Sequence, residues 1–391
     1  MTTIYLRKNK EESLLRFHPW VFSGAVGHIN GTPQEGDLVC VRSSAGEPLG
    51  VGHYQQGSIV CRILEFFTDT LPADFWLQRI TSAYNMRRQL GLVSPSNNSY
   101  RLIHGEGDFL PGLIVDVYDD TAVLQAHSAG MHRERKEIAN AITRVVKEVK
   151  NVYYKSEGTL PFSRSFNDIQ DGYLIGSEGD CLAIENNLTF AIDWLRGQKT
   201  GFFIDQRENR ALVERYSADR KVLNMFCYTG GFSVYAMRGG AKEVTSVDSS
   251  QKAVDLVTQN ILRNFPDSAN HNEVCQDAFR FLDTMPSDYD LIILDPPAFA
   301  KHRDAVRNAL QGYKRLNAKA FEKIASGGIL FTFSCSQAID KDMFRLAVFS
   351  AAAMSGRRVR ILHQLHQPQD HPINIYHPEG EYLKGLVLYV E

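Results

Sequence analysis

The stretch that decides the fold is KVLNMFCYTGGFSVYAMR, residues 221–238. Four of its first six residues are apolar, which is typical of a strand. The pair Gly230–Gly231 marks a turn, and a helix is predicted to about Arg238. Glycines in such a turn let a ligand approach the backbone closely. The stretch therefore predicts a strand–turn–helix unit with a ligand site at the end of the strand.

Strands and helices alternate along the rest of the chain from about Asn187. Besides this unit, the predicted elements are strands at 243–248, 273–276, 290–295, 327–335 and 382–390, and helices at 251–264 and 306–325. Such alternation is typical of a parallel α/β sheet. We therefore expect residues 186–391 to form a Rossmann-like domain.

Short alternating segments and frequent glycines characterise the first 70 residues. Strands are predicted at 37–42 and 58–64, and this pattern favours a small β-barrel. A helix at 74–90 follows, then a hairpin around Asp119–Asp120 and a helix at about 131–147. The chain is thus predicted to be an α/β protein with three domains: a barrel at 1–70, a small α+β domain at 71–185 and the α/β domain at 186–391.

Composition narrows the class of protein. With 43% hydrophobic and 23% charged residues, the chain of 391 residues is an ordinary globular protein. Its net charge of -2 gives no general attraction to nucleic acid, so an RNA partner would be held by local patches. The six cysteines contain no CxxC pair, which argues against a zinc ribbon or a thioredoxin-like motif. The sequence has no signal-peptide pattern and no long apolar stretch, so we expect a cytoplasmic protein that does not associate with a membrane. We also expect no metal site.

Acidic residues end successive predicted strands and indicate a cofactor with a ribose. Asp248 follows the glycine turn by roughly 20 residues, a spacing at which an acid accepts from ribose hydroxyls. GxGxxG is absent, so the turn suits a ribose and an amino-acid tail better than the diphosphate of a dinucleotide. Asp277 follows a further strand and is placed to accept from an adenine amino group. Each acid alone is equally well explained as a solvated strand end.

Asp295 and Cys335 end two further predicted strands and point to one pocket. The prolines of Asp295–Pro296–Pro297 fix the direction of the acid. A thiolate is soft enough to add to C6 of a pyrimidine, which makes C5 a carbon nucleophile, while the acid holds N3. The alternatives are a plain strand exit for the acid and a small buried hydrophobe for the cysteine. The other five cysteines are assigned to packing.

A basic run follows the proline pair and is a candidate RNA contact. It contains Lys301, Arg303 and Arg307, which are placed to hold the phosphates beside a flipped cytidine. Phe299 is a candidate for stacking on a base. The alternatives are a solvated helix face for the cations and a core position for the aromatic ring.

Four segments together resemble the motifs of class I S-adenosylmethionine-dependent methyltransferases. They are residues 224–232, 247–250, 295–299 and 333–336. The most similar family is ribosomal large subunit methyltransferase I, which makes 5-methylcytosine in 23S rRNA, and residues 199–207 resemble that family's entry into the catalytic domain. Residues 18–24 and 50–54 are similar to its PUA domain, an RNA-binding barrel. The resemblance therefore covers nearly the whole chain.

The resemblance implies S-adenosylmethionine as the cofactor, 23S rRNA as the substrate and a role for each matching residue. The implied roles are Asn224, Phe226 and Gly230 at the methionine end, Asp248 and Ser249 at the ribose, Asp277 and Ala278 beside the adenine, Cys335 as nucleophile and Asp295 as its partner. It also suggests a homodimer, which no residue in the sequence requires.

Three points stay open at the level of sequence. A different family of RNA cytosine-C5 methyltransferases carries a second cysteine where this chain has Ala298, so the base that removes the C5 proton is not identified. An rRNA guanine methyltransferase is an alternative, because its chemistry needs no thiol. A non-catalytic RNA-binding factor in ribosome assembly is another.

Overall fold

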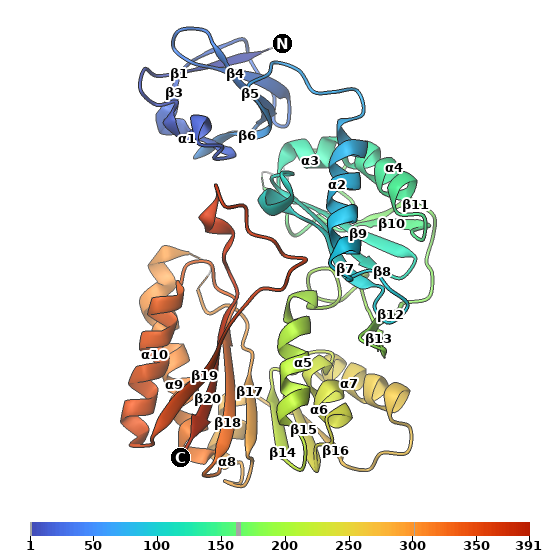
Figure 1. Cartoon of the computed structure of the whole chain (residues 1–391), viewed down its shortest axis with the longest axis vertical. Helices are drawn as coiled ribbons and strands as arrows, with labels where there is room; N and C mark the ends of the chain where they lie inside the picture. Colours follow the sequence, from blue (N-terminus) through green and yellow to red (C-terminus); the bar gives the residue numbers. More distant parts are fainter. Residues whose placement is uncertain (1, 162–165, 301) are drawn as a thin grey trace. The chain divides into compact units, whose positions relative to one another are not determined.

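The computed structural model describes residues 2–161, 166–300 and 302–391 (Figure 1). The described chain divides into two compact units. Unit 1 comprises Met1–Asn186, Ile192–Ile204 and Gln369–Gly380, and unit 2 comprises Asn187–Ala191, Asp205–Pro368 and Glu381–Glu391. The predicted three-domain division, with cuts after residues 70 and 185, stays a prediction.

The first sheet of unit 1 has six strands in the order β2-β6-β5-β4-β1-β3. The strands are β1 (Thr3–Leu6), β2 (Trp20–Phe22), β3 (Val26–Asn30), β4 (Leu38–Arg42), β5 (Pro48–Tyr54) and β6 (Ile59–Phe66), with helix α1 at Glu12–Leu15. Ile4, Val41 and Cys61 belong to its buried core. Glycine is required in β5, because a Cβ at Gly52 would lie 2.1 Å from the carbonyl oxygen of Arg62 on β6. The strands predicted from the glycine-punctuated pattern are confirmed.

The second sheet of unit 1 has the strand order β11-β10-β9-β8-β7. Its strands are β7 (Ser99–His104), β8 (Leu113–Tyr118), β9 (Thr121–Ala126), β10 (Asn151–Tyr154) and β11 (Gly172–Ile175), and its helices are α2 (Phe75–Gln89), α3 (Ala129–Arg133) and α4 (Arg135–Val145). The hairpin predicted around Asp119–Asp120 joins β8 and β9. The single helix predicted at 131–147 is wrong in detail, because α3 ends at Arg133 and α4 begins at Arg135.

Segment 369–380 joins unit 1 through a buried polar network. The backbone N–H of Arg101 donates to Asp370 Oδ2 at 3.0 Å, and Arg87 Nη2 donates to the carbonyl oxygen of Asp370 at 2.8 Å. The Arg87 side chain is fully buried and also pairs with Asp108. Breaking these bonds would leave buried charged groups without partners, so the network holds segment 369–380 on unit 1.

Unit 2 contains a seven-stranded sheet in the order β16-β15-β14-β17-β18-β20-β19. Its strands are β14 (Lys221–Met225), β15 (Glu243–Asp248), β16 (His271–Cys275), β17 (Leu291–Leu294), β18 (Gly328–Ser334), β19 (Val359–His366) and β20 (Lys384–Val390). Along the chain between β11 and β14, β12 (Leu182–Glu185) and β13 (Leu188–Ala191) are short strands that pair with each other. Strands β14 to β18 run parallel, and β20 is antiparallel to β18 and β19. The order changes direction between β14 and β17, which is where open α/β sheets bind ligands.

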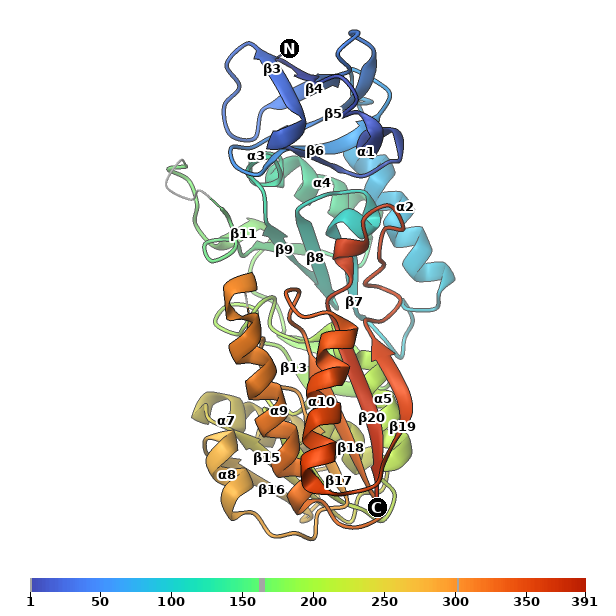
Figure 2. The same cartoon turned by 90° about the vertical axis from the view of Figure 1, so that its left-hand side faces the viewer.

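Six helices cover the sheet of unit 2. They are α5 (Arg207–Tyr216), α6 (Gly231–Arg238), α7 (Gln251–Asn264), α8 (Ala278–Thr284), α9 (Val306–Lys323) and α10 (Lys341–Ser355). Helices α5 to α7 lie on one face and α8 to α10 on the other (Figure 1), and α9 and α10 lie side by side (Figure 2). Among the described residues, no helix combines the length and apolarity needed to cross a membrane.

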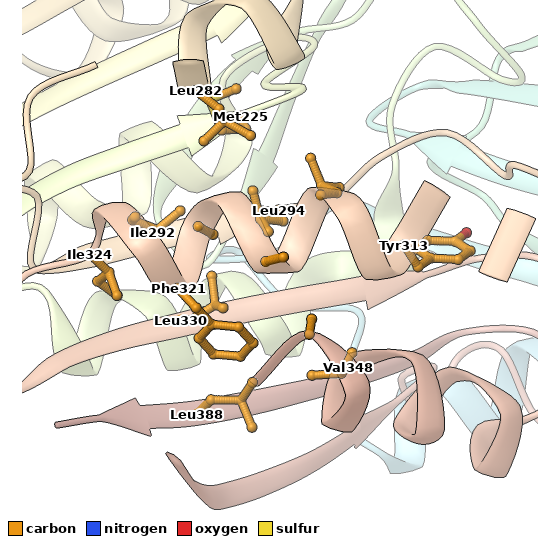
Figure 3. Packing of buried hydrophobic residues seen from close by; sticks show 14 of the residues in the cluster. Met225, Leu282, Ile292, Leu294, Tyr313, Phe321, Ile324, Leu330, Val348 and Leu388 are labelled. Atoms are coloured by element: carbon orange, nitrogen blue, oxygen red, sulfur yellow. The ribbon is translucent and has the colours of Figure 1, made fainter. Parts of the chain in front are cut away.

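The core on the α8–α10 face anchors the strands that carry the candidate site. Phe321 of α9 packs with Leu330 of β18 and Leu388 of β20 (Figure 3). Tyr313, nearer the start of α9, lies toward the carboxyl ends of the strands. Each Å² of apolar surface removed from water stabilises the folded state by about 25 cal/mol. This core therefore supports the loops that follow the strands.

Candidate active site

Asp295 and Cys335 follow two neighbouring strands at one edge of the sheet of unit 2. β17 ends at Leu294 and pairs in parallel with β18, and Leu294 lies opposite Thr332. Continuing this register brings Asp295 level with Phe333, two residues before Cys335. Paired strands lie about 4.8 Å apart, so the two side chains predicted to do chemistry emerge close together.

The pKa of the Tyr313 hydroxyl is affected by both of these groups. The hydroxyl is buried, and burial raises its pKa to about 12, with negative charge at Cys335 and at Asp295 adding to the effect. Both groups therefore act on the hydroxyl of Tyr313.

Asp295 is a carboxyl group tuned to neutral pH. Its pKa is raised to about 7, first because protein atoms remove water from it and second because the Asp205 carboxylate lies nearby. Gln206 Nε2 donates to Asp295 Oδ2 at 3.0 Å and opposes the shift. Asp205 is itself held by the hydroxyl of Tyr382, which donates at 2.7 Å. A carboxyl group with a pKa of about 7 can give or accept a proton at neutral pH.

The loop after Cys335 is anchored on two sides. Ser336 Oγ donates to the carbonyl oxygen of Ala300 at 2.5 Å. The ammonium of Lys384, the first residue of β20, donates to the carbonyl oxygens of Ser336 and Ile339, both at 2.6 Å. Burial lowers the pKa of Lys384 to about 8, and the nearby Cys335 sulfur is the first of the groups that oppose this shift.

The turn after β14 has a backbone built for a ligand. Phe226, Tyr228 and Gly230 have φ values of 59°, 46° and 79°, all in the left-handed region. Such conformations are costly for bulky residues and cluster at functional sites. At Gly230 a Cβ would lie 2.9 Å from Val257 Cγ1, so only glycine fits without a shift.

Asp248 connects this turn to the end of β15. Its Oδ2 accepts from the backbone N–H of Tyr228 at 3.0 Å, and its Oδ1 accepts from that of Ser250 at 3.0 Å. A carboxylate has about four acceptor positions, so Asp248 retains capacity for two ribose hydroxyls. Ser249, the next residue, is exposed beside it.

The other cofactor residues implied by the resemblance have supporting roles in the structure. Asn224 is fully buried, and its Nδ2 donates to Ser233 Oγ at 2.9 Å beneath the turn, while its Oδ1 has no hydrogen-bond partner. Asp277 is exposed and caps α8, with Oδ1 accepting from the N–H of Arg280 at 3.0 Å, and Ala278 is buried. One oxygen of Asp277 is thus committed to the helix.

The candidate RNA contacts are only partly described. Phe299 is half-buried, with its ring 4.6 Å from that of Tyr313. Arg307 is exposed at the start of α9. Lys301 lies outside the described residues, and Arg303 is described only as part of the turn Arg303–Ala305. Of the four candidate RNA contacts, Arg307 is the one whose side chain is described as an exposed cation.

Three residues of the site were missed by the sequence prediction. Asp205 and Gln206 sit in the segment 199–207, which was noted only as an entry motif, and their carboxyl and amide groups were a usable signal. Lys384 gave no signal, because one lysine in a predicted strand has no pattern of its own.

Comparisons with known proteins identify the family of the chain. The family model for S-adenosylmethionine-dependent methyltransferases matches residues 164–378, and that for a PUA-like domain matches residues 4–66. A protein of Tolumonas auensis named ribosomal RNA large subunit methyltransferase I is 38% identical over 99% of each chain. The chain belongs to the ribosomal RNA large subunit methyltransferase I family. A relative from Aeromonas hydrophila with the same name is 39% identical over 99% of this chain and 98% of its own.

Two solved structures share the fold of this chain over its whole length. A putative methyltransferase from Streptococcus mutans matches with a TM-score of 0.84 at 23% identity, covering 100% of both chains. A structure of SMU.776, a putative methyltransferase complexed with SAH, matches with a TM-score of 0.85 at 24% identity, again over both whole chains.

These findings confirm several predictions. The N-terminal domain is PUA-like, the C-terminal domain has the methyltransferase fold, and the cofactor is S-adenosylmethionine. The strained turn at Phe226–Gly230 and the carboxylate of Asp248 fit that cofactor, because they offer a close backbone approach and acceptors for a ribose.

Proposed function

We propose that this protein transfers a methyl group from S-adenosylmethionine to C5 of a cytidine in the RNA of the large ribosomal subunit, corresponding to 23S rRNA. The relatives' names support large-subunit rRNA as the substrate. The observation that carries the cytosine assignment is the pairing of Cys335 with Asp295 at adjacent strand ends, with the pKa of the acid raised to about 7. Methylation of a guanine nitrogen needs no thiolate, because that nitrogen is itself the nucleophile.

The first step joins the enzyme to the base. The Cys335 thiolate forms a bond to C6 of the cytosine, and the C5–C6 π electrons move toward C5 and the ring nitrogen. Asp295, protonated in part near neutral pH, gives its proton to N3 as charge develops there. C5 thereby becomes an electron-rich carbon.

The second step transfers the methyl group and releases the enzyme. When bound, S-adenosylmethionine would supply a methyl group on a positively charged sulfur. The bond between that sulfur and the methyl carbon would break as C5 takes the methyl group, leaving a neutral thioether. Loss of the C5 proton to a base then returns an electron pair to the ring, breaks the S–C6 bond and regenerates the Cys335 thiolate. Asp295 recovers the N3 proton.

We propose for the remaining site residues the binding roles predicted from the sequence and the family resemblance. The backbone at Phe226 and Gly230 would meet the methionine end, with Asn224 supporting the turn from beneath. Asp248 and Ser249 would take the ribose, and Asp277 and Ala278 would flank the adenine. Lys301, Arg303 and Arg307 would hold RNA phosphates, and Phe299, packed on Tyr313, would offer its exposed edge to the base.

Mass-spectrometric mapping of rRNA nucleosides tests the proposal. In cells lacking the protein, we expect one 5-methylcytidine of the large-subunit RNA to be missing. The intact gene and the control Cys181→Ser should restore it, and Cys335→Ser should not. Cys181 is a matched control because it is a partly exposed cysteine of unit 1. A missing methylguanosine, or restoration by Cys335→Ser, would contradict the cytosine assignment, and an unchanged set of modifications would favour a non-catalytic factor.

A further inference from the structure

The ammonium group of Lys384 is unusually buried for a lysine. The residue is 6% exposed, and buried lysines are rare unless they are paired. Lys384 lies opposite Ser334 in the antiparallel pair β18–β20, one residue before Cys335. Its side chain therefore reaches the loop that carries the sulfur.

The hydrogen bonds of Lys384 hold that loop but do not neutralise the charge. Nζ donates to the carbonyl oxygens of Ser336 and Ile339, each at 2.6 Å. These acceptors lie on the first turns after Cys335, so they fix the ammonium beside it. Carbonyl oxygens carry only partial charge, and a buried cation is stabilised chiefly by an anion.

Three groups that can carry a negative charge act on Lys384. They are Cys335, Glu381 and Asp340, and Cys335 has the largest effect. Asp340 is exposed and caps α10 by accepting from the N–H of Met343 at 2.8 Å, and Glu381 is exposed. Water screens both carboxylates, whereas the partly buried sulfur is screened less.

Among the described residues, charged and titratable groups from several elements lie around Cys335. Asp295 comes from the end of β17, and its carboxylate opposes formation of a second anion. Tyr313 comes from α9 and stays a neutral hydroxyl, since burial raises its pKa to about 12. The guanidinium of Arg210, on α5, lowers the pKa of Asp295, whereas the ammonium of Lys384, from β20, is held at the loop that follows Cys335.

We propose that Lys384 is a positioning residue that keeps Cys335 in its thiolate form and fixes the loop from which the sulfur attacks. The proposal rests on the nucleophilic role given to Cys335 above. Lys384 acts through the sulfur and need not touch the base. An opposite charge within about 4–6 Å lowers the pKa of an acidic group by roughly 1–3 units.

Alkylation of Cys335 by iodoacetamide at a series of pH values tests this directly. Mass spectrometry of the peptide that contains Cys335 separates its rate from those of the other five cysteines. An ordinary thiol is half-ionised near a pH of about 8.5. In the intact protein we expect a midpoint at least about one unit lower, and a midpoint at or above the ordinary value would overturn the proposal.

Substitution of the lysine supplies the second arm. In Lys384→Met the midpoint should rise by about one unit, so that alkylation at pH 7 slows roughly tenfold. Lys384→Arg keeps the charge and should retain most of the shift. The matched control is Lys221→Met, because Lys221 starts β14 at the opposite end of the same sheet and pairs with Asp288. An unchanged midpoint in Lys384→Met with Cys335 still reactive would refute the role.

Two features keep this test separate from the proposed function. The alkylation rate needs neither RNA nor methyl transfer, so a low midpoint that depends on Lys384 would stand even if Cys335→Ser retained activity. Conversely, loss of activity in Cys335→Ser with an ordinary midpoint would preserve the function and reject the lysine. Should Lys384→Met fail to fold, the midpoint of the intact protein decides alone.

Discussion

At the scale of single residues, the carboxyl group of Asp295 links folding to pH. Burial and the nearby Asp205 raise its pKa to about 7, above the value of about 3.9 expected in the unfolded chain. The folded protein therefore binds more protons than the unfolded chain between these two values. Stability contributed by this group is present below about pH 4 and is lost as the pH rises to about 7.

Asp295→Asn removes that dependence and gives a clear expectation. The variant should gain thermal stability relative to the native protein at pH 8 by a few degrees, and the gain should shrink toward pH 4, since the native carboxyl is then neutral. Thermal melts at several pH values measure it. Methyl transfer should fall at every pH, and a gain that grows at low pH would contradict the assigned pKa.

Gly230 tests the cofactor turn. Gly230→Ala must hold a side chain at φ 79° and push Val257 aside, so we expect a loss of about 1–2 kcal/mol of stability and at least roughly tenfold weaker S-adenosylmethionine binding. Calorimetric titration and thermal melts check both. Gly356→Ala is the matched control, because Gly356 has φ 67° with no atom within 4 Å of the added Cβ. Equal binding losses in the two variants would argue against the turn.

At the scale of elements, helix α8 separates two roles of Asp277. Its carboxylate caps the helix, and removing such a cap costs about 1 kcal/mol. Asp277→Ala should lose both stability and cofactor affinity. Asp277→Ser should recover stability, because serine caps well, without recovering affinity, because its side chain is too short to reach an adenine. Full affinity in Asp277→Ser, measured by titration, would leave Asp277 only its capping role.

The predictability of the site also depends on the elements. Asp295, Cys335 and Gly230 were found from sequence because each follows an apolar strand pattern, and local patterns suffice there. Lys384 was missed because its role arises from pairing with β18, about 50 residues earlier in the chain. β19 was missed for a similar reason, since its alternating residues form a strand only against β20. The split between α3 and α4 was not predicted, because the sequence contains no strong helix breaker at that point.

At the scale of the whole molecule, the chain does not divide at single cuts. Segment 369–380 leaves the sheet between β19 and β20, belongs to unit 1 and returns to unit 2 at Glu381. A sequence-based boundary cannot represent this excursion, because the contacts that fix it, such as that between Arg101 and Asp370, join residues far apart in the chain. Methyl transfer should accordingly be tested on the full chain.

The central claim is a bond between the sulfur of Cys335 and the cytosine ring. Large-subunit RNA containing 5-fluorocytidine tests it most directly, because a fluorine at C5 leaves no proton to remove and the adduct cannot break down. We expect a denaturant-resistant protein–RNA complex that requires S-adenosylmethionine, maps to the peptide containing Cys335 and is absent from Cys335→Ser. Methylation of normal RNA without such a complex, or attachment of the RNA to another residue, would contradict the account.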